Sequence, residues 1–341
     1  MWRVRPSHTI PASGEAAPTR PQLSPLGRVQ TMKFDSDPNS PMKYLTAFAS
    51  LASLIAVAAT AGGQASHADH RAIARPASTT APNVVILRRD GIRTVTVTAS
   101  DYSFAAPDTI PAGLTELRLL NRGTEMHHVM LVRLDAGKTM TDLFAAMQPD
   151  SPPPAWAHDA GGPQTPGPGG ESNAILRLVA GRYAMICVIP SPDGKPHVMK
   201  GMAKEIVVTP ATSNTSNANV RVNSTMTLFD YAFQLSQPLQ AGRQTIRVKN
   251  TAEQSHEVVI IKLQPGKKPA DMLAWMEKME GPPPGAPIGG TTPMARGEEN
   301  IITVDLPAGE YGLLCFVSDA KDGKPHFMHG MVTQLTIPAP Q

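Results

Sequence analysis

The sequence predicts an all-β protein of two tandem sandwich units, each with one short inserted helix, and three features support this fold class. The chain repeats itself at a nearly constant offset, its apolar residues fall in short strand-like runs between Gly, Pro and Asn, and one helical pattern occurs in each repeat. At 341 residues the chain is long enough for two domains that each bury a core.

The internal repeat has an offset of 129 residues. The segment Asp-Tyr-Ser-Phe at 101–104 returns as Asp-Tyr-Ala-Phe at 230–233, and the offset stays within one residue as far as Met202 and Met331. An offset that steady indicates one duplicated domain. We therefore divide the chain into a leader and signal peptide (1–65), a linker (66–82), a first domain (83–209), a linker (210–221) and a second domain (222–338).

Strand-like runs make up most of each repeat. In the first repeat they alternate apolar and polar residues, or stay apolar for a few positions, at 94–98, 114–120, 129–132 and 203–208. The Pro- and Gly-rich segments 148–170 and 281–297 show no period, and we interpret them as loops. The two copies differ most there, so we expect any difference in partner to lie in these loops.

One helix is predicted in each repeat. Apolar residues stand at helical spacing, and Thr139 and Asp142 are placed as a capping pair at the start of the first helix. We interpret both methionine-rich stripes as core contacts of a helix lying over the sandwich. The stripes are Met140, Leu143, Phe144 and Met147 in the first copy, and Met272, Leu273, Met276 and Met279 in the second.

The first residues resemble an export signal. Met42-Lys43 precedes an apolar, alanine-rich stretch at 44–61, and small residues follow it, which predicts cleavage near Ala61 or Ala65. A retained membrane anchor is the alternative, although the stretch is short for a membrane span. We expect a secreted or periplasmic protein with no membrane span after removal of the signal.

The charge of the mature chain is balanced. Residues 1–65 hold six of the 31 basic and three of the 28 acidic side chains, which leaves 25 of each. Net charge therefore gives no reason to expect a nucleic-acid partner. The chain has two cysteines, one in each repeat, so they either pair with each other or have separate roles.

Cysteine, histidine and methionine recur together in both copies. Gly181-Arg-Tyr-Ala-Met-Ile-Cys187 is followed by His197 and Met202, and Gly309-Glu-Tyr-Gly-Leu-Leu-Cys315 by His326 and Met331. Thiolate and thioether ligands favour reduced copper, whereas imidazole accepts both oxidation states. With the upstream His127 and His256, each copy has a set of donors that can hold copper while it gains and loses one electron.

At these residues the chain resembles the cupredoxins, the blue-copper β-sandwiches. The matching motifs are a His after an Asn-containing turn, the Gly-x-Tyr-x-x-x-Cys run and the His-x4-Met segment. The resemblance implies an eight-stranded Greek-key sandwich in each domain, with one copper near one end that is used for electron transfer. It assigns the ligand roles to His127, Cys187, His197 and Met202 in the first domain, and to His256, Cys315, His326 and Met331 in the second.

The segment between Cys and His departs from the family. Nine residues separate Cys187 from His197 and ten separate Cys315 from His326, where typical members have a shorter loop. Each long segment contains Asp-Gly-Lys-Pro, a turn sequence that predicts a projecting hairpin and a return of the histidine to the site.

The neighbours of the cysteines suggest a non-enzymatic role. Ile186 and Val188 flank Cys187, and Leu314 and Phe316 flank Cys315, so the histidines that link a second copper centre in multicopper oxidases and nitrite reductases are missing. From this we predict no substrate reduction, no oxygen chemistry and no enzymatic activity. The expected partner is a redox or copper-exchange protein of unidentified kind.

Two other functions remain open at this point. A copper(I) trafficking or storage protein would use the additional donors Met199, Met328 and His329, whose alternative role is packing. A metal-free binding module would place its function in the loop around Trp156. We further expect His128 to lie at the surface or behind the site, and Tyr102 and Tyr231 to be core residues.

Overall fold

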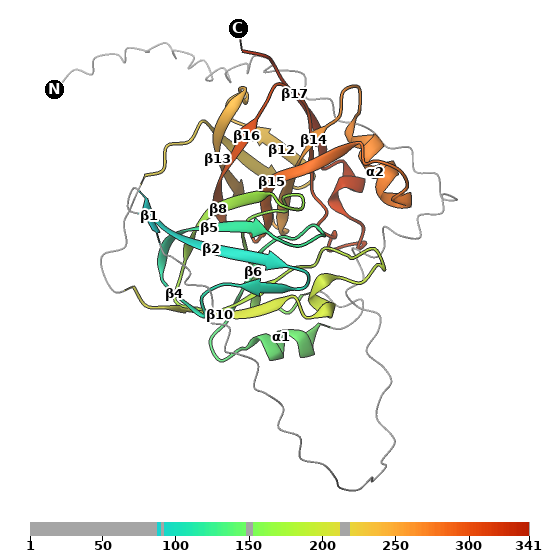
Figure 1. Ribbon diagram of the computed structural model, residues 1–341. Helices are drawn as coiled ribbons and strands as arrows, with labels where there is room; N and C mark the ends of the chain where they lie inside the picture. Colours follow the sequence, from blue (N-terminus) through green and yellow to red (C-terminus); the bar gives the residue numbers. More distant parts are fainter. Residues whose placement is uncertain (1–86, 90–91, 148–152, 212–218, 341) are drawn as a thin grey trace, which may run out of the picture.

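The structure is a computed structural model, and it describes residues 87–89, 92–147, 153–211 and 219–340 (Figure 1). The predicted leader, signal peptide and first linker, and most of the second linker, lie outside these residues. Within the described residues, no helix is both long and apolar enough to cross a membrane.

The first unit contains ten strands and one α-helix among the described residues. In chain order they are β1 (Leu87–Arg89), β2 (Ile92–Ser100), β3 (Ser103–Ala105), β4 (Thr109–Pro111), β5 (Gly113–Asn121), β6 (Met130–Leu134), α1 (Met140–Ala146), β7 (Ala157–Gly161), β8 (Glu171–Leu178), β9 (Gly181–Ile186) and β10 (Ala203–Thr209).

The second unit repeats this order with eight strands and one α-helix in the described part of the chain. They are β11 (Ser224–Phe229), β12 (Ala232–Leu235), β13 (Gly242–Asn250), β14 (His256–Leu263), α2 (Pro269–Lys278), β15 (Gly285–Met294), β16 (Glu299–Leu306), β17 (Gly309–Leu314) and β18 (Val332–Ile337). Strand pairing is also repeated: β2 runs parallel to β5 as β11 does to β13, and β9 lies between β6 and β10 as β17 lies between β14 and β18.

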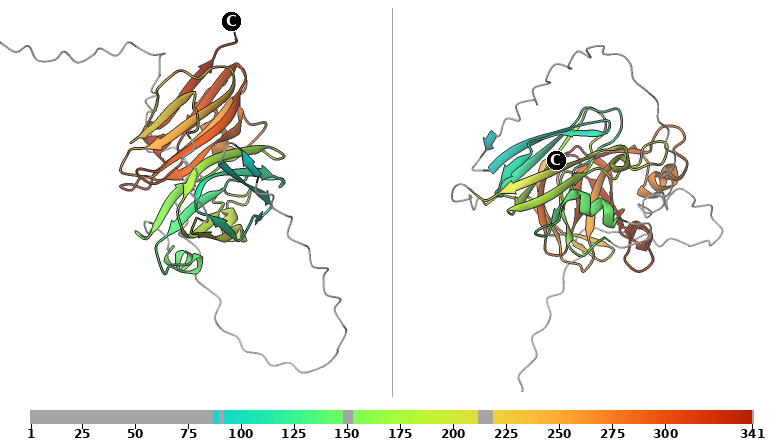
Figure 2. Two further views of the ribbon diagram at one scale, coloured as in Figure 1. Left: turned by 90° about the vertical axis from the view of Figure 1, so that its left-hand side faces the viewer. Right: turned by 90° about the horizontal axis from the view of Figure 1, so that it is seen from below.

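Two sheets of nine strands each run through both units. The first has the order β1-β2-β5-β8-β16-β13-β11-β12, with β3 paired to β2, and the second has the order β18-β17-β14-β15-β7-β6-β9-β10-β4. Each sheet takes about half of its strands from each unit, so the two sandwiches join edge to edge (Figures 1 and 2). The junctions are β8 with β16 and β7 with β15.

Alternation along the strands builds the cores. In β5 every second residue is buried, and Leu117 and Leu119 point into the sandwich, where they pack with Val95 and Val97 of β2. Because the inner faces of the two sheets pack in this way, each unit is built around a central cluster of 18 buried residues, and the cluster of the second unit also includes Ala174 of β8. The all-β prediction with two sandwiches is confirmed.

The two helices lie on the outer face of the second sheet. Thr139 and Asp142 form the predicted capping box of α1, and Leu143 packs on Val132 and Ile186. In the second copy Met272 and Leu273 of α2 pack in the same way over β14 and β17, while Met279 ends the helix and is exposed.

The interpretation of 148–170 and 281–297 as loops is wrong in part. They contain β7 and β15, the strands that join the units. Their glycines serve close backbone approach: a Cβ at Gly290 would lie 1.9 Å from the carbonyl oxygen of Val258, and one at Gly162 would lie 2.2 Å from that of Val129. A Gly- and Pro-rich composition therefore marks tight strand packing here as well as turns.

Candidate metal centres

Cys187 follows the last residue of β9 and is held there by backbone hydrogen bonds on both sides. Its amide donates to the carbonyl of Met202 (3.2 Å), and its own carbonyl accepts from Val198 (2.7 Å). The side chain points into the core and is fully buried, like that of Cys315 in the second unit. Both cysteines are free, so the alternative that they pair with each other is excluded.

The long segment after Cys187 folds into the predicted hairpin. Pro190 and Pro196 form a β-bridge, Ser191 donates its amide to Lys195, and Gly194 takes a positive φ of 80° at the tip. The amide of His197 then donates to Ile189 (2.9 Å), and the turn η2 (His197–Lys200) begins. The extra residues thus project away, and the histidine returns beside the cysteine.

The second hairpin closes in the same way despite its additional residue. Ser318 bridges to Pro325, Asp319 donates its amide to Lys324 (2.8 Å), and Gly323 takes the positive φ. The turn η3 (His326–His329) follows.

The loop between β5 and β6 positions His127. The side chain of Asn121 accepts from the amide of Gly123 and donates to the carbonyl of Glu125, which closes a tight turn before the histidine. Asn250 makes the same two bonds in the second unit, to Ala252 and Gln254. The Asn-containing turn noted in the sequence is therefore the device that directs this histidine inward.

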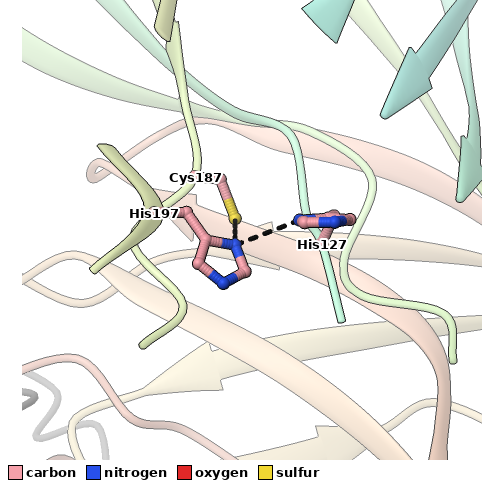
Figure 3. A group of neighbouring side chains, drawn as sticks. All are labelled: His127, Cys187 and His197. Atoms are coloured by element: carbon pink, nitrogen blue, oxygen red, sulfur yellow. Dashed lines mark hydrogen bonds between the residues drawn. The ribbon is translucent and has the colours of Figure 1, made fainter. Parts of the chain in front are cut away.

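The structure brings His127, Cys187 and His197 together at one end of the first sandwich (Figure 3). The two Nδ1 atoms lie 3.0 Å apart, and the Sγ of Cys187 lies 3.5 Å from Nδ1 of His197. All three residues have no solvent exposure.

The second unit forms the matching group. In it the Sγ of Cys315 lies 3.8 Å from Nδ1 of His256 and 3.5 Å from Nδ1 of His326. These residues are also fully buried.

Carboxylates hold the outer nitrogens of the first pair of histidines. Asp101 lies 2.7 Å from Nε2 of His127, and Glu125 lies 2.9 Å from Nε2 of His197. Because a carboxylate only accepts hydrogen bonds, each Nε2 carries the hydrogen and each Nδ1 presents a lone pair. The lone pairs of the two Nδ1 atoms and the sulfur of Cys187 then face one another, and the thiol of Cys187 is a hydrogen-bond donor to Nδ1 of His197 as long as it keeps its proton.

This arrangement fits a soft or borderline metal ion. A cation at the common point would satisfy all three donors, and carboxylates behind ligating histidines are a regular feature of metal sites. Sulfur with two imidazoles suits copper. The two groups of donors therefore fit copper, one ion in each unit.

The second site has a different carboxylate arrangement. Asp230 lies 3.0 Å from Nε2 of His256, whereas the nearest oxygen of Asp319 is 3.9 Å from Nε2 of His326. Among the described residues, that Nε2 has no hydrogen-bond partner. Asp319 instead accepts from Tyr231 and from Gln254.

Burial governs the protonation of the donors. It raises the pKa of the Cys187 thiol to about 12 and that of Cys315 further, and it lowers the pKa of His326 to about 4. Burial also lowers the pKa of His197 and His256, which favours the neutral imidazoles that bind metal. Copper must displace the thiol proton of each cysteine.

Met202 and Met331 lie next to the cysteines. Both are fully buried, and each accepts the amide of its cysteine at its backbone carbonyl, at 3.2 Å for Met202 and 3.3 Å for Met331. Their role as weak fourth ligands, and the ligand roles of the histidines and cysteines, remain our proposal.

The additional donors lie outside both groups. Met199 is half exposed on η2, and Met328 packs on the outer cluster under α2. His329 is hydrogen-bonded to Asp322 and forms a separate, partly exposed group with it and Asp319. Trp156, in the loop considered for a binding module, packs over the outer cluster beside α1, with Lys138 above its ring.

The tyrosines contribute more than the predicted core packing. Tyr102 meets the ring of His197 edge-on at 5.0 Å, and its hydroxyl donates to Glu125. Tyr231 meets His326 in the same way at 5.5 Å. The repeated Asp-Tyr pair was the available signal for these residues and for Asp101 and Asp230, whereas nothing in the sequence indicated Glu125.

No protein family matches the chain as a sequence, and no curated protein matches it. Among solved structures, the chain is similar to auracyanin from Roseiflexus castenholzii (25% identity, 34% of this chain and 95% of that one, TM-score 0.24). It is also similar to the blue copper oxidase of Nitrosomonas europaea (16% identity, 72% and 85%, TM-score 0.22) and to a copper-containing nitrite reductase of Thermus scotoductus (11% identity, 72% and 61%, TM-score 0.21).

Both units are cupredoxin-like. The two-sheet sandwich of each unit and the position of the donors at one end of it agree with this fold, whereas the long hairpin between the cysteine and the second histidine is a departure from it. The similar structures include copper oxidases and a nitrite reductase, which contradicts our prediction that the chain is not an enzyme. The residues beside the two cysteines do not justify that exclusion, and we withdraw it.

Proposed function

We propose that the protein is an exported copper protein that transfers one electron at a time through a mononuclear copper site in each unit. The observation that carries the proposal is the pair of buried His-Cys-His groups, each with two inward-facing Nδ1 atoms and one sulfur. Copper bound there would supply a one-electron couple between its two oxidation states.

The surroundings of the donors support electron transfer. Three of the four imidazoles, all but that of His326, are fixed from behind by Asp101, Glu125 and Asp230. The sulfurs lie in the core beside backbone that is held by hydrogen bonds. Donors that cannot move between the two oxidation states keep the structural rearrangement small. The apolar segment 44–61 supports export, and the partner we propose is a redox protein.

Copper(I) exchange is the second candidate, and Met199 favours it. This methionine is half exposed two residues after the buried His197, so it could receive an ion from outside. The full burial of His197 and Cys187 opposes rapid exchange, and we therefore place electron transfer first.

Absorption spectra of the copper-loaded mature chain test the proposal. We expect an intense thiolate-to-copper(II) band, reduced to one unit's contribution in Cys187→Ser and in Cys315→Ser, and absent from the double variant. A chain that takes up no copper with its thiols reduced would refute the proposal. Tight copper(I) binding without the band would favour exchange, provided that Met199→Leu weakens it.

A further inference from the structure

A row of three buried, hydrogen-bonded side chains crosses the junction between the units beside both metal sites. It consists of His128, Gln164 and Glu257, which are 4%, 2% and 5% exposed. His128 follows the candidate ligand His127, and Glu257 follows the candidate ligand His256. Gln164 comes from the segment between β7 and β8, which inserts against β15 of the other unit.

The hydrogen bonds along this row of side chains have a defined direction. The amide of Val188 donates to Nε2 of His128 (3.1 Å), so Nδ1 of His128 carries the hydrogen and donates to Oε1 of Gln164 (3.2 Å). The amide nitrogen of Gln164 then donates to Oε2 of Glu257 (2.8 Å).

The row of hydrogen bonds ends at Phe316, the residue that follows the second cysteine. The other oxygen of Glu257 accepts from the amide of Phe316 (3.0 Å), as His128 accepts from the amide of Val188 in the first unit. The backbone amide of Glu257 also donates to the Sγ of Cys315 (3.5 Å). In the first unit the amide that His128 accepts from belongs to Val188, which is bonded to Cys187. The three residues therefore connect the two cysteines through covalent and hydrogen bonds alone.

The backbone of Gln164 is fixed as firmly as its side chain. Its carbonyl accepts from the hydroxyl of Ser172 (2.6 Å), its amide donates to Gly290, and its Oε1 also accepts from the amide of Thr165 (2.9 Å). A buried network in which every polar atom has a partner holds one conformation. Such a network can serve as a permanent link between the sites.

We infer that His128, Gln164 and Glu257 form the route by which the two copper sites of this protein exchange an electron. The inference rests on the proposed function. With copper bound at both sites, the electron would leave a copper(I) ion at one site and reach a copper(II) ion at the other, so that one ion would be oxidised as the other is reduced, with no net proton transfer and no external reactant. Tunnelling decays less steeply through covalent and hydrogen-bonded atoms than across van der Waals gaps, so the route is favoured over direct passage through apolar packing.

The test measures electron redistribution in the full copper-loaded chain. A radical pulse reduces a small fraction of the oxidised protein, and the bands of the two sites, assigned with Cys187→Ser and Cys315→Ser, are followed over time. We expect a slower phase whose rate does not depend on protein concentration and which is absent when only one site is loaded.

Gln164→Met removes the side-chain hydrogen bonds with His128 and Glu257, together with the one from the amide of Thr165, and keeps the volume of the side chain. We expect the rate of the concentration-independent phase to fall by about tenfold, with both copper bands retained. Glu257→Gln is a second variant of equal shape. Its side-chain NH2 group must face either the NH2 group of Gln164 or the backbone N–H of Phe316, so one of these two hydrogen bonds is lost. We expect a smaller decrease in the rate than in Gln164→Met.

Asn173→Ala is the matched control. Asn173 makes two hydrogen bonds to Thr303 across the other junction, so its loss weakens the contact between the units and leaves the route intact. An equal decrease in Asn173→Ala, or an unchanged rate in Gln164→Met and Glu257→Gln, would overturn the inference. Absence of copper binding in the unmodified chain would instead refute the proposed function.

A second readout does not depend on electron transfer. In Cys315→Ser, loading the first site with copper(I) should shift the amide NMR signal of Phe316 through the hydrogen-bonded chain. We expect the shift to disappear in the Gln164→Met background and to persist in the Asn173→Ala background. Persistence in both would show that the route does not link the sites.

Discussion

The two metal sites have the same donors and a different placement of negative charge. In the first unit Glu125 reaches His197, and the hairpin contributes the neutral Ser191. In the second unit the equivalent of Glu125 is Gln254, and the acid stands in the hairpin as Asp319. Duplication has kept three donors while the carboxylate has moved from one loop to the other.

The different position of the carboxylate changes the hydrogen bonding of the second histidine of each site. His197 donates to a carboxylate, whereas Nε2 of His326 has no partner among the described residues. A hydrogen-bonded imidazole is the more basic ligand and stabilises the more highly charged ion. We therefore expect the first site to have the lower reduction potential, so that an electron shared between the sites resides mainly on the second.

The largest expected effect is on the pH dependence of stability. It involves His128 and Glu257, which occupy equivalent positions in the two units and both contact Gln164. Burial is the main cause that raises the pKa of Glu257 to about 7, and burial lowers the pKa of His128 to about 4. The folded state therefore holds the proton of Glu257 more tightly than the unfolded state, and stability falls as the pH rises from about 4.5 to about 7. His128 has the opposite slope, with stability rising between about pH 4 and 6.5.

Glu257→Gln separates these two contributions. In the copper-free protein, we expect the variant to gain about 3 kcal/mol relative to the unmodified chain on going from pH 4.5 to 7.5. Urea unfolding at several pH values measures this difference. A constant difference across that range would show that Glu257 titrates normally in the folded protein.

The next effect concerns Gly123, whose equivalent in the second unit is Ala252. A Cβ at Gly123 would lie 2.2 Å from Asp101 and 2.5 Å from Nε2 of His127, so Gly123→Ala must displace the carboxylate. We expect a loss of about 2 kcal/mol in stability and weaker copper binding by the first site. Ala252→Gly, the reverse change, should cost less than about 1 kcal/mol. Equal effects in the two units would contradict the steric account.

Replacement of each acid by its amide tests the expected difference in reduction potential between the two sites. Glu125→Gln leaves His197 without a carboxylate, and we expect copper affinity at the first site to fall by about tenfold and its potential to rise toward that of the second. Asp319→Asn should change the second site less, because its oxygen is 3.9 Å from His326. Potentiometric titration of the two bands measures both. A larger shift in Asp319→Asn would reverse the comparison.

The smallest effect is expected at Met199. Because this side chain is half exposed and outside the donor group, Met199→Leu should leave the copper band and the affinity unchanged. Met202→Leu, at the buried position next to Cys187, should alter the band of the first site alone. Copper(I) binding assays and spectra of both variants provide the measurement, and a loss of affinity in Met199→Leu would favour the exchange function.

Much of the fold could be predicted because its signals are local. The strand alternation, the capping box at Thr139 and the 129-residue offset are each visible within short windows or by self-comparison. The hairpins after Cys187 and Cys315 also followed from a turn sequence. The strands β7 and β15 could not be predicted, because their Gly and Pro content obscures the strand period.

The duplication, the sandwich units and the donor types can be predicted from the sequence, since they depend on residue identity and period. Three features follow from the folded structure instead: the sheets run through both units, Glu125 lies behind His197, and Gln164 joins His128 to Glu257. These contacts join segments far apart in the chain, and they depend on how loops close and how two edges meet. No short-range pattern contains that information, because each partner on its own has the properties of an ordinary polar residue.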